Sequence, residues 1–274
     1  MNNKNSRSIA VSDQANVQKT TDPSLYVRYL PVIILVLVAL TATVCAGIFM
    51  GHETLMTVAM AATTIPALLL LIYIYKSDVI ESEPAGLLYL LFISGILATV
   101  PVILIKLLLG SSLSPVVMVA ILSLVEELSI YLVLYFETWD HLAFNYRFDG
   151  VVYGATVAIG YEVSLAVLYL SGGLEKIALS RSVIPVHCAL GIYMGFFYGQ
   201  AKARMLEGDK SGAALMQVFS LLLPIVLNFV YELFMSNSSN QAIMIFFIAF
   251  LVLLNVAAVI CVRKFSRADR RLGR

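Results

Sequence analysis

Charged residues are scarce in this chain, and their scarcity decides the class of protein. Only 13% of the 274 residues are Asp, Glu, Lys or Arg, whereas 60% are hydrophobic. Soluble domains carry about 25% charged and about 45–50% apolar residues. A soluble core of this size needs a polar shell, which so few charges do not supply. The composition therefore excludes an ordinary soluble domain and predicts that most of the chain lies in lipid.

Paired cysteines and an excess of one charge are also lacking. The three cysteines, Cys45, Cys188 and Cys261, lie in apolar stretches, and no two of them have CxxC spacing. This pattern predicts neither a disulfide framework nor a zinc ribbon. Lys and Arg number 18 and Asp and Glu number 17, so no basic field indicates a nucleic-acid partner.

Long apolar runs follow a polar N-terminal stretch. Each run is long enough to cross about 30 Å of hydrocarbon, and backbone hydrogen bonding in lipid makes such runs helical. The sequence therefore predicts an all-α, polytopic integral membrane bundle of about eight transmembrane helices. The predicted spans are 29–50, 54–75, 86–109, 114–136, 150–170, 182–201, 213–236 and 241–262.

Basic residues predict the orientation of these spans, because cytoplasmic loops carry an excess of Lys and Arg. If the N-terminus is cytoplasmic, most of the basic residues fall in inside segments. An eight-span count also keeps the six basic residues from Arg263 to Arg274 inside. We therefore expect the N- and C-termini in the cytoplasm, with the lipid bilayer as the surrounding partner.

The predicted organisation has five parts. Residues 1–28 form a disordered cytoplasmic tail, because their polar composition does not bury a core. The other parts are three accessory spans in 29–109, a core of four spans in 114–236, a final span at 241–262 and a basic cytoplasmic tail at 263–274.

Ionisable residues inside the predicted spans are the candidate functional groups, because each costs about 2.5–3.5 kcal/mol on insertion scales. Glu126 lies about 18 Å below the outer end of its span, near the midplane, at about 1.5 Å per residue. By the same arithmetic Glu162, His187, Asn228 and Glu232 fall between the midplane and the outer surface. A shared level indicates a common site rather than scattered structural pairs.

Small residues recur every four positions on the two spans that carry Glu162 and His187. The rows are Gly150, Gly154, Ala158, Glu162 and Ala166 on the fifth span, and His187, Gly191, Gly195 and Gly199 on the sixth. Small residues at this spacing let helix backbones approach closely in lipid. Because the two spans are antiparallel, packing along the rows is expected to bring Glu162 and His187 together.

Glu126 and Glu127 are adjacent on the fourth span, with Ser123 one turn before them. Adjacent helical side chains point about 100° apart, so we expect one carboxylate to face a cavity and the other to bond a neighbouring helix. A glutamate near a histidine in a half-dry cavity suits a general base acting on water. Glu and His are also metal ligands, but their spacing does not support a metal site, and we expect no bound cofactor; a divalent metal is the open alternative.

Three stretches resemble motifs of one membrane-protein family. Residues 125–128, VEEL, are similar to a double-glutamate motif, and residues 149–154, DGVVYG, to a DGxxYG stretch. Arg181 and residues 187–190, HCAL, are similar to an Arg followed by a His-Ala-Leu helix. Together, over roughly 123–232, they resemble the PrsW-like intramembrane proteases, in the superfamily of CAAX prenyl proteases and bacteriocin-immunity membrane proteins.

The resemblance implies a peptidase, glutamate- or metal-dependent, of the bacterial plasma membrane. It implies a membrane-protein or peptide substrate, cut near or outside the outer face. A glutamate polarises the water, and the histidine positions it or stabilises the oxyanion. Glu126, Glu127 and His187 carry over directly, and Glu162, Asn228 and Glu232 carry over by analogy, with Glu162 expected to orient the Glu–His pair. The predicted site therefore has Glu126, Glu127, His187 and Glu162 as catalytic groups, and Asn228, Glu232, Arg181 and Asp149 as supporting groups.

The chain departs from the family pattern at several positions. Ile130 stands where the family commonly has Lys, Leu165 and Ala166 replace a Glu-Asn pair, and Asn228 takes the place of a His. Two alternatives therefore stand beside the peptidase. One is a proton-coupled membrane transporter, because intramembrane Glu and His also serve proton relays. The other is a catalytically inactive relative that binds a membrane partner, as an immunity protein does.

Overall fold

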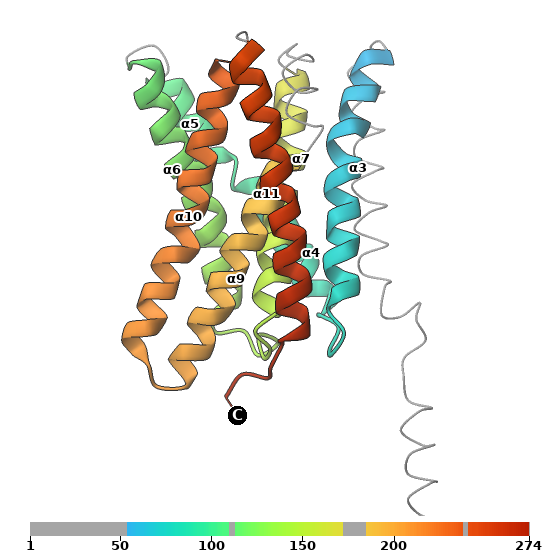
Figure 1. Cartoon of the computed structure of the whole chain (residues 1–274), viewed down its shortest axis with the longest axis vertical. Coiled ribbons are helices and arrows are strands. Elements are labelled where there is room, and N and C mark those ends of the chain that lie inside the picture. The colour runs from blue at the N-terminus through green and yellow to red at the C-terminus, as the bar shows by residue number, and fades with distance from the viewer. Residues whose placement is uncertain (1–53, 110–112, 172–184, 238–240, 274) are drawn as a thin grey trace, which may run out of the picture.

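The computed structural model describes residues 54–109, 113–171, 185–237 and 241–273, and these segments form a bundle of helices (Figure 1). The helices are α3 (Thr54–Ser77), α4 (Ala85–Leu97), α5 (Val100–Leu109), α6 (Pro115–Thr138), α7 (Asp149–Ser171), α9 (Val186–Leu206), α10 (Lys210–Ser236) and α11 (Gln241–Arg267). The only β-pairing among the described residues is an isolated bridge between Tyr146 and Arg271. The all-α prediction is therefore confirmed for this part of the chain.

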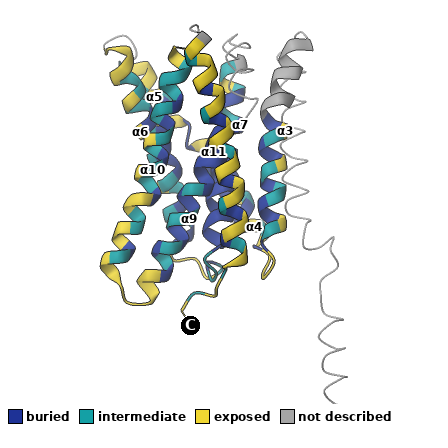
Figure 2. Cartoon of the chain, viewed as in Figure 1, coloured by how far each residue is buried: buried dark blue, intermediate teal, exposed yellow. Residues whose placement is uncertain are grey.

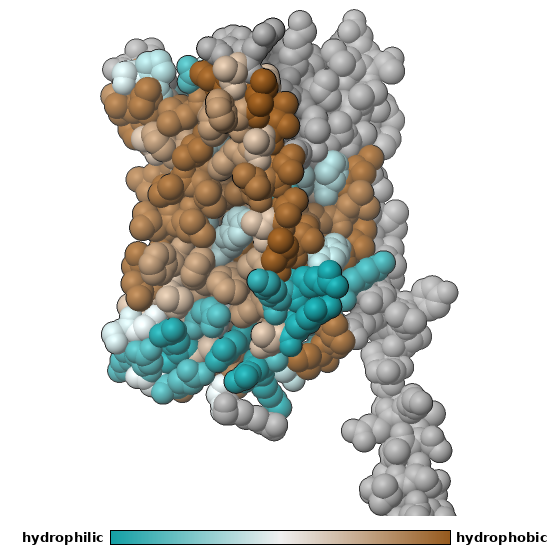
Figure 3. Space-filling view, in the orientation of Figure 1, coloured by the Kyte–Doolittle hydropathy of each residue, from teal (hydrophilic) through white to brown (hydrophobic). Residues whose placement is uncertain are grey.

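Five helices in the described segments are long and apolar enough to cross a membrane. They are Ala85–Leu109, which joins α4 and α5, Pro115–Thr138, Asp149–Tyr169, Lys210–Ser236 and Ala242–Arg267. Figure 3 shows a hydrophobic belt above a hydrophilic end, formed by the α9–α10 turn and the C-terminal segment. The protein is therefore a multi-pass integral membrane protein. The total of eight spans stays a prediction, since the expected span 29–50 and the tail 1–28 lie outside the described residues.

The predicted span 86–109 is divided into α4 and α5. Pro101 accounts for the division, because proline has no N–H for the helical ladder and its ring clashes with the preceding turn. The hydroxyl oxygen of Thr99, within the break, lies 3.0 Å from the hydroxyl oxygen of Ser164 on α7. This contact fixes the bend against the centre of the bundle.

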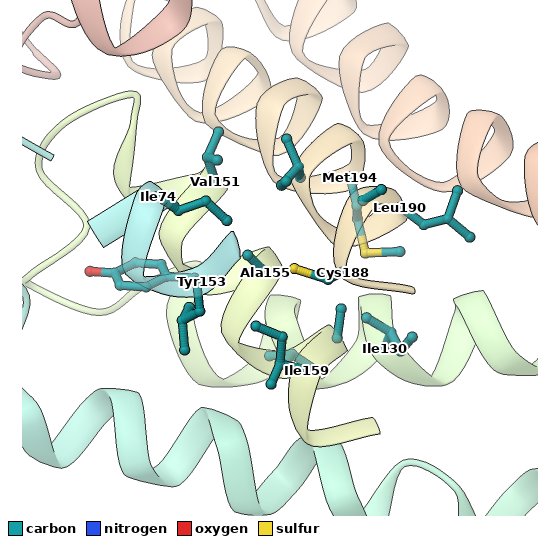
Figure 4. Packing of buried hydrophobic residues seen from close by; sticks show 14 of the residues in the cluster. Ile74, Ile130, Val151, Tyr153, Ala155, Ile159, Cys188, Leu190 and Met194 are labelled. Atoms are coloured by element: carbon teal, nitrogen blue, oxygen red, sulfur yellow. The ribbon is translucent and has the colours of Figure 1, made fainter. Parts of the chain in front are cut away.

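The centre of the bundle is the antiparallel pair of α7 and α9. A Cβ added to Gly150 would lie 2.6 Å from the carbonyl oxygen of Gly195, and one added to Gly191 would lie 2.6 Å from Cβ of Ala158. The two backbones are therefore in direct contact along the predicted rows of small residues. Figure 2 shows this centre as the most buried part of the protein, and in Figure 4 Cys188 of α9 lies beside residues of α7.

α9 is enclosed by protein rather than by lipid. It packs against α7, α10 and α11, and most of its side chains are buried. An enclosed helix needs no lipid-facing apolar surface, whereas its last turns, with the half-buried Gln200 and Lys202 and the exposed Arg204, reach the hydrophilic end of the bundle. The predicted span 182–201 is observed as a helix that ends five residues later, at Leu206; residues 182–184 lie outside the described part.

A buried polar cluster joins the α3–α4 connection to the start of α7 at the hydrophilic end. The hydroxyl of Tyr153 donates a hydrogen bond to Glu83, and the side chain of Glu83 is also hydrogen-bonded to that of Asp149. Asp149 Oδ2 in turn accepts the backbone N–H groups of Asn145 and Tyr146 at 2.9 and 2.7 Å. Burial, and then the nearby Asp149 carboxylate, raise the pKa of Glu83. The cluster therefore holds a proton at neutral pH.

The close approach of α7 and α9 predicts a strong effect of a single methyl group. Gly150→Ala is expected to lower stability by about 1–3 kcal/mol, because the new Cβ meets backbone that has no room to move. Thermal unfolding of the purified protein in detergent measures the effect. Gly86→Ala is the matched control, since nothing lies within 4 Å of the added Cβ. An equal loss in both variants would contradict the close packing.

The protonated cluster predicts a pH dependence of stability. Folded Glu83 keeps a proton that its unfolded form releases above a pKa of 4.5. The stabilisation is therefore complete below that value and is lost as the pH rises toward the raised pKa of the folded state. We expect the melting temperature of the wild type to fall between about pH 5 and about pH 8. Glu83→Gln, which mimics the protonated acid, should flatten this slope; parallel slopes would contradict the assignment.

Candidate active site

Glu127 and His187 form the centre of the candidate site. Glu127 lies in the middle of α6, and His187 lies in the first turn of α9. Glu127 Oε1 is 3.5 Å from His187 Nδ1, and the two side chains are 0% and 4% exposed. Two ionisable groups from different helices are thus buried together inside the membrane bundle. Because this burial is costly, such a pair is a candidate functional site.

Polar atoms that lack a hydrogen-bond partner among the described residues gather around this pair. They are both carboxylate oxygens of Glu127, both ring nitrogens of His187, Ser123 Oγ and Asn228 Oδ1. A buried polar atom without a partner costs about 1–3 kcal/mol, and such atoms usually bind ordered water. Carboxylate and hydroxyl oxygens that accept hydrogen bonds, beside an imidazole that donates them, can bind a small polar molecule such as water.

Glu126 has a different partner from Glu127. Its Oε2 accepts a hydrogen bond from Nδ2 of Asn228 on α10 at 2.9 Å, and both residues are buried. The offset of about 100° between adjacent helical side chains explains the separation. The bond ties α6 to α10 and leaves Glu127 as the carboxylate that faces the imidazole.

Glu162 binds the start of α9. Its Oε2 accepts the backbone N–H of Cys188 at 3.1 Å. The first N–H groups of a helix have no acceptor within the helix, and the helix dipole favours a negative charge there. The sequence predicts that Glu162 orients the Glu–His pair; the structure shows that it holds the turn that carries His187.

Tyr161 is a site residue that the sequence analysis missed. Its ring centroid lies 4.9 Å from that of the His187 imidazole, in an edge-to-face arrangement of 67°. Such pairs contribute about 0.5–1.5 kcal/mol. Its position next to Glu162 was the one signal in the sequence. That signal was not enough, because the rotation of α7 about its axis decides which residue adjacent to Glu162 faces the imidazole.

The other predicted residues lie elsewhere. Glu232 is on α10, one turn beyond Asn228, and is half-buried. Arg181 lies outside the described residues. Asp149 begins α7, about 20 Å along the helix from Glu162 at about 1.5 Å per residue. It accepts the backbone N–H groups of the loop before α7 at the hydrophilic end, at a distance from the Glu127–His187 pair, and its supporting role in the site stays a prediction.

A buried carboxylate beside an imidazole inside a multi-pass helical bundle is an arrangement typical of membrane-embedded hydrolases. Comparison with known families points to the same class of protein. Residues 83–260 match the PrsW family, described as intramembrane metalloproteases. This match covers more than half of the chain, and the chain belongs to the PrsW family. The predicted resemblance is therefore confirmed.

Curated relatives that carry the name Protease PrsW agree with this assignment. The one from Geobacillus kaustophilus (strain HTA426) is 34% identical over 179 residues, which cover 63% of this chain and 77% of the relative. The one from Halalkalibacterium halodurans is 29% identical over 223 residues, 79% of this chain and 99% of the relative. The one from Bacillus subtilis (strain 168) is 30% identical over 185 residues, which cover 64% of this chain and 81% of the relative. The chain is therefore a membrane peptidase; no solved structure matches it.

The family description implies a metal, and the described donor set does not fit one well. No three His, Cys, Asp or Glu side chains come together as a possible metal site within the described segments. Glu126 is bonded to Asn228 and Glu162 to the N–H of Cys188. Glu127 and His187 thus offer two protein ligands, whereas catalytic zinc usually has three.

The Glu126–Asn228 bond predicts an energetic coupling between α6 and α10. Asn228→Ala leaves a buried carboxylate without its donor and should cost about 1–3 kcal/mol or more. In a double-mutant cycle with Glu126→Ala, the losses should be non-additive by about 1–3 kcal/mol, because either single change already breaks the bond. Unfolding in detergent measures each corner of the cycle. Additive losses would show that the two side chains are not bonded.

Proposed function

We propose that this peptidase cleaves a membrane-associated protein with Glu127 as the general base on a water molecule. The observation that carries the proposal is the buried Glu127–His187 pair, whose polar atoms have no other partner in the described part of the chain. A water molecule bound beside the pair, on the polar atoms that have no partner, gains an acceptor for its proton and a donor that orients it. The family membership supports the reaction class.

The proton path in the proposed reaction runs through Glu127. Its carboxylate takes a proton from the water as the water oxygen attacks the carbonyl carbon of the peptide bond. His187 positions that water or stabilises the developing oxyanion, for which a donor inside a low-dielectric site is effective. The protonated Glu127 then gives its proton to the leaving amide nitrogen, which restores the carboxylate as the two product chains separate.

Three further contacts hold the Glu127–His187 pair in position. Glu162 and Tyr161, both on α7, contact the first turn of α9 and the imidazole itself. The Glu126–Asn228 bond fixes the rotation of α6, which directs Glu127 toward His187. These residues act through the pair, since a misplacement of about 1 Å is enough to lower the rate about 100-fold.

The proposed substrate is a membrane protein cut near the outer face of the bacterial plasma membrane. The hydrophilic end of the bundle carries basic residues such as Lys202, Arg204 and Lys210, and the positive-inside rule makes that end cytoplasmic. α9 begins with His187 and ends at this basic end. The Glu127–His187 pair therefore lies in the half of the bundle away from the cytoplasm.

Reconstituted vesicles test the mechanism. The purified chain is incubated with a panel of single-pass membrane proteins, and new N-termini are identified by mass spectrometry. Glu127→Gln and His187→Ala should each lower cleavage by about 10²–10⁴-fold. Glu207→Gln, an exposed change at the hydrophilic end, is the control and should cleave normally.

Complete processing by both Glu127→Gln and Glu126→Gln would remove the glutamate mechanism. An intact but inactive wild type that still binds these proteins would favour the protease-like binding protein. Proton uptake into the vesicles without added substrate would favour the proton-coupled transporter, because an intramembrane Glu and His then serve as a relay.

A further inference from the structure

A groove on the lipid-facing side separates the bent α4–α5 span from α6. It has a volume of about 380 Å³. Its walls include Ser94, Ala98 and Pro101 on one side and Ser129, Leu132 and Glu137 on the other. The wall on α6 begins at Ser129, one helical turn from Glu126, and runs toward the hydrophilic end.

The packing of the neighbouring helices explains why the groove is open. α4 lies in backbone contact with α7, because a Cβ added to Gly95 would meet the carbonyl group of Val157. The bend at Pro101 is held to the same helix through the Thr99–Ser164 contact. α6 packs on α10, on α7 and on both halves of the α4–α5 span. Because the α4–α5 span is also held on α7, its contact with α6 leaves the groove between the two helices.

The surface of the groove suits another helix. The small side chains Ser94, Ala98 and Ser129 line the groove together with Leu97 and Phe136, which are 61% and 77% exposed and offer apolar surface to a partner helix. The hydroxyl of Ser129 is bonded within its own helix to Val125 O at 2.7 Å. Leu132 is 40% exposed, so an apolar partner surface gains contact there. The groove is therefore lined by apolar and small side chains along most of its length.

A carboxylate at one end of the groove selects the kind of helix that binds there. Glu137 lines the end of the groove nearest the hydrophilic end of the bundle, and none of the ion pairs between described residues includes it. Membrane-spanning helices carry Lys or Arg at their cytoplasmic ends. A helix lying in the groove with its cytoplasmic end at this side would place such a cation beside Glu137, whereas a lipid acyl chain has no charge to pair with it.

We propose that this groove docks the transmembrane helix of a single-pass substrate, with a Lys or Arg at its cytoplasmic end beside Glu137. The inference extends the proposed function, since it names where the substrate is held before its chain reaches Glu127. Specificity then depends on small residues along one face of the substrate helix and on the sign of its flanking charge.

Photo-crosslinking of the full chain in vesicles tests the proposal. The protein carries Glu127→Gln, so that docking is measured without cleavage, and a benzophenone amino acid replaces Leu132. The probe is a synthetic Leu–Ala helix of about 22 residues with two lysines at one end. The same photoreactive group at Leu253, which is 68% exposed on α11, is the control. We expect several-fold more probe adduct at position 132.

A charge exchange gives the sharper outcome. Glu137→Lys should lower the adduct of the lysine-flanked probe by about fivefold, and a glutamate-flanked probe should recover it. Glu137→Gln, a milder change, should lower the first adduct without favouring the second probe. Thermal unfolding verifies that all variants are folded.

Equal adducts at positions 132 and 253, lipid adducts alone, or adducts between two copies of the chain would each overturn the docking site. Adducts of the probe at position 132, combined with no cleavage of the single-pass protein panel by the wild type, would instead leave the groove assigned and remove the proposed peptidase mechanism. The two proposals therefore fail on different measurements.

Discussion

The direct contact between the backbones of α7 and α9 is the constraint on which the site depends. Glycines at Gly150, Gly191 and Gly195 remove the side chains that would keep the helices apart. In lipid, where the hydrophobic effect does not drive helices together, such contact supplies much of the association. It brings Glu162 within reach of the first turn of α9, and so fixes the place of His187.

The buried ionisable groups of this protein differ in whether a hydrogen-bond partner or a bound proton offsets the free-energy cost of their burial. Glu126 and Glu162 each accept a hydrogen bond from a defined donor, and Glu83 holds a proton beside Asp149 and Tyr153. Such groups stabilise helix positions. Among the described residues, Glu127 has the imidazole of His187 at 3.5 Å as its one polar side-chain neighbour. A general base needs a carboxylate oxygen that is free to accept a proton from bound water, and Glu127 offers one.

Periodicity and spacing predicted much of this arrangement. The four-residue rows gave the α7–α9 contact, and the about 100° offset gave different partners for Glu126 and Glu127. Neither signal identified which carboxylate faces His187. Glu83 and Tyr161 were missed because nothing local marks them: Glu83 lies in a connection between helices, and Tyr161 is one aromatic residue among 14 tyrosines.

The sequence by itself determined that the protein lies in lipid, that it is helical and to which family it belongs. Hydropathy, the length of the apolar runs and the order of the motifs can all be read from short segments. Only the tertiary structure decided the role of each acid. The rotation of α6 is set by its bond to Asn228 on α10, and the start of α9 is set by Glu162. Both depend on contacts between residues far apart in the chain, and the orientation of a helix about its axis is fixed by its neighbours.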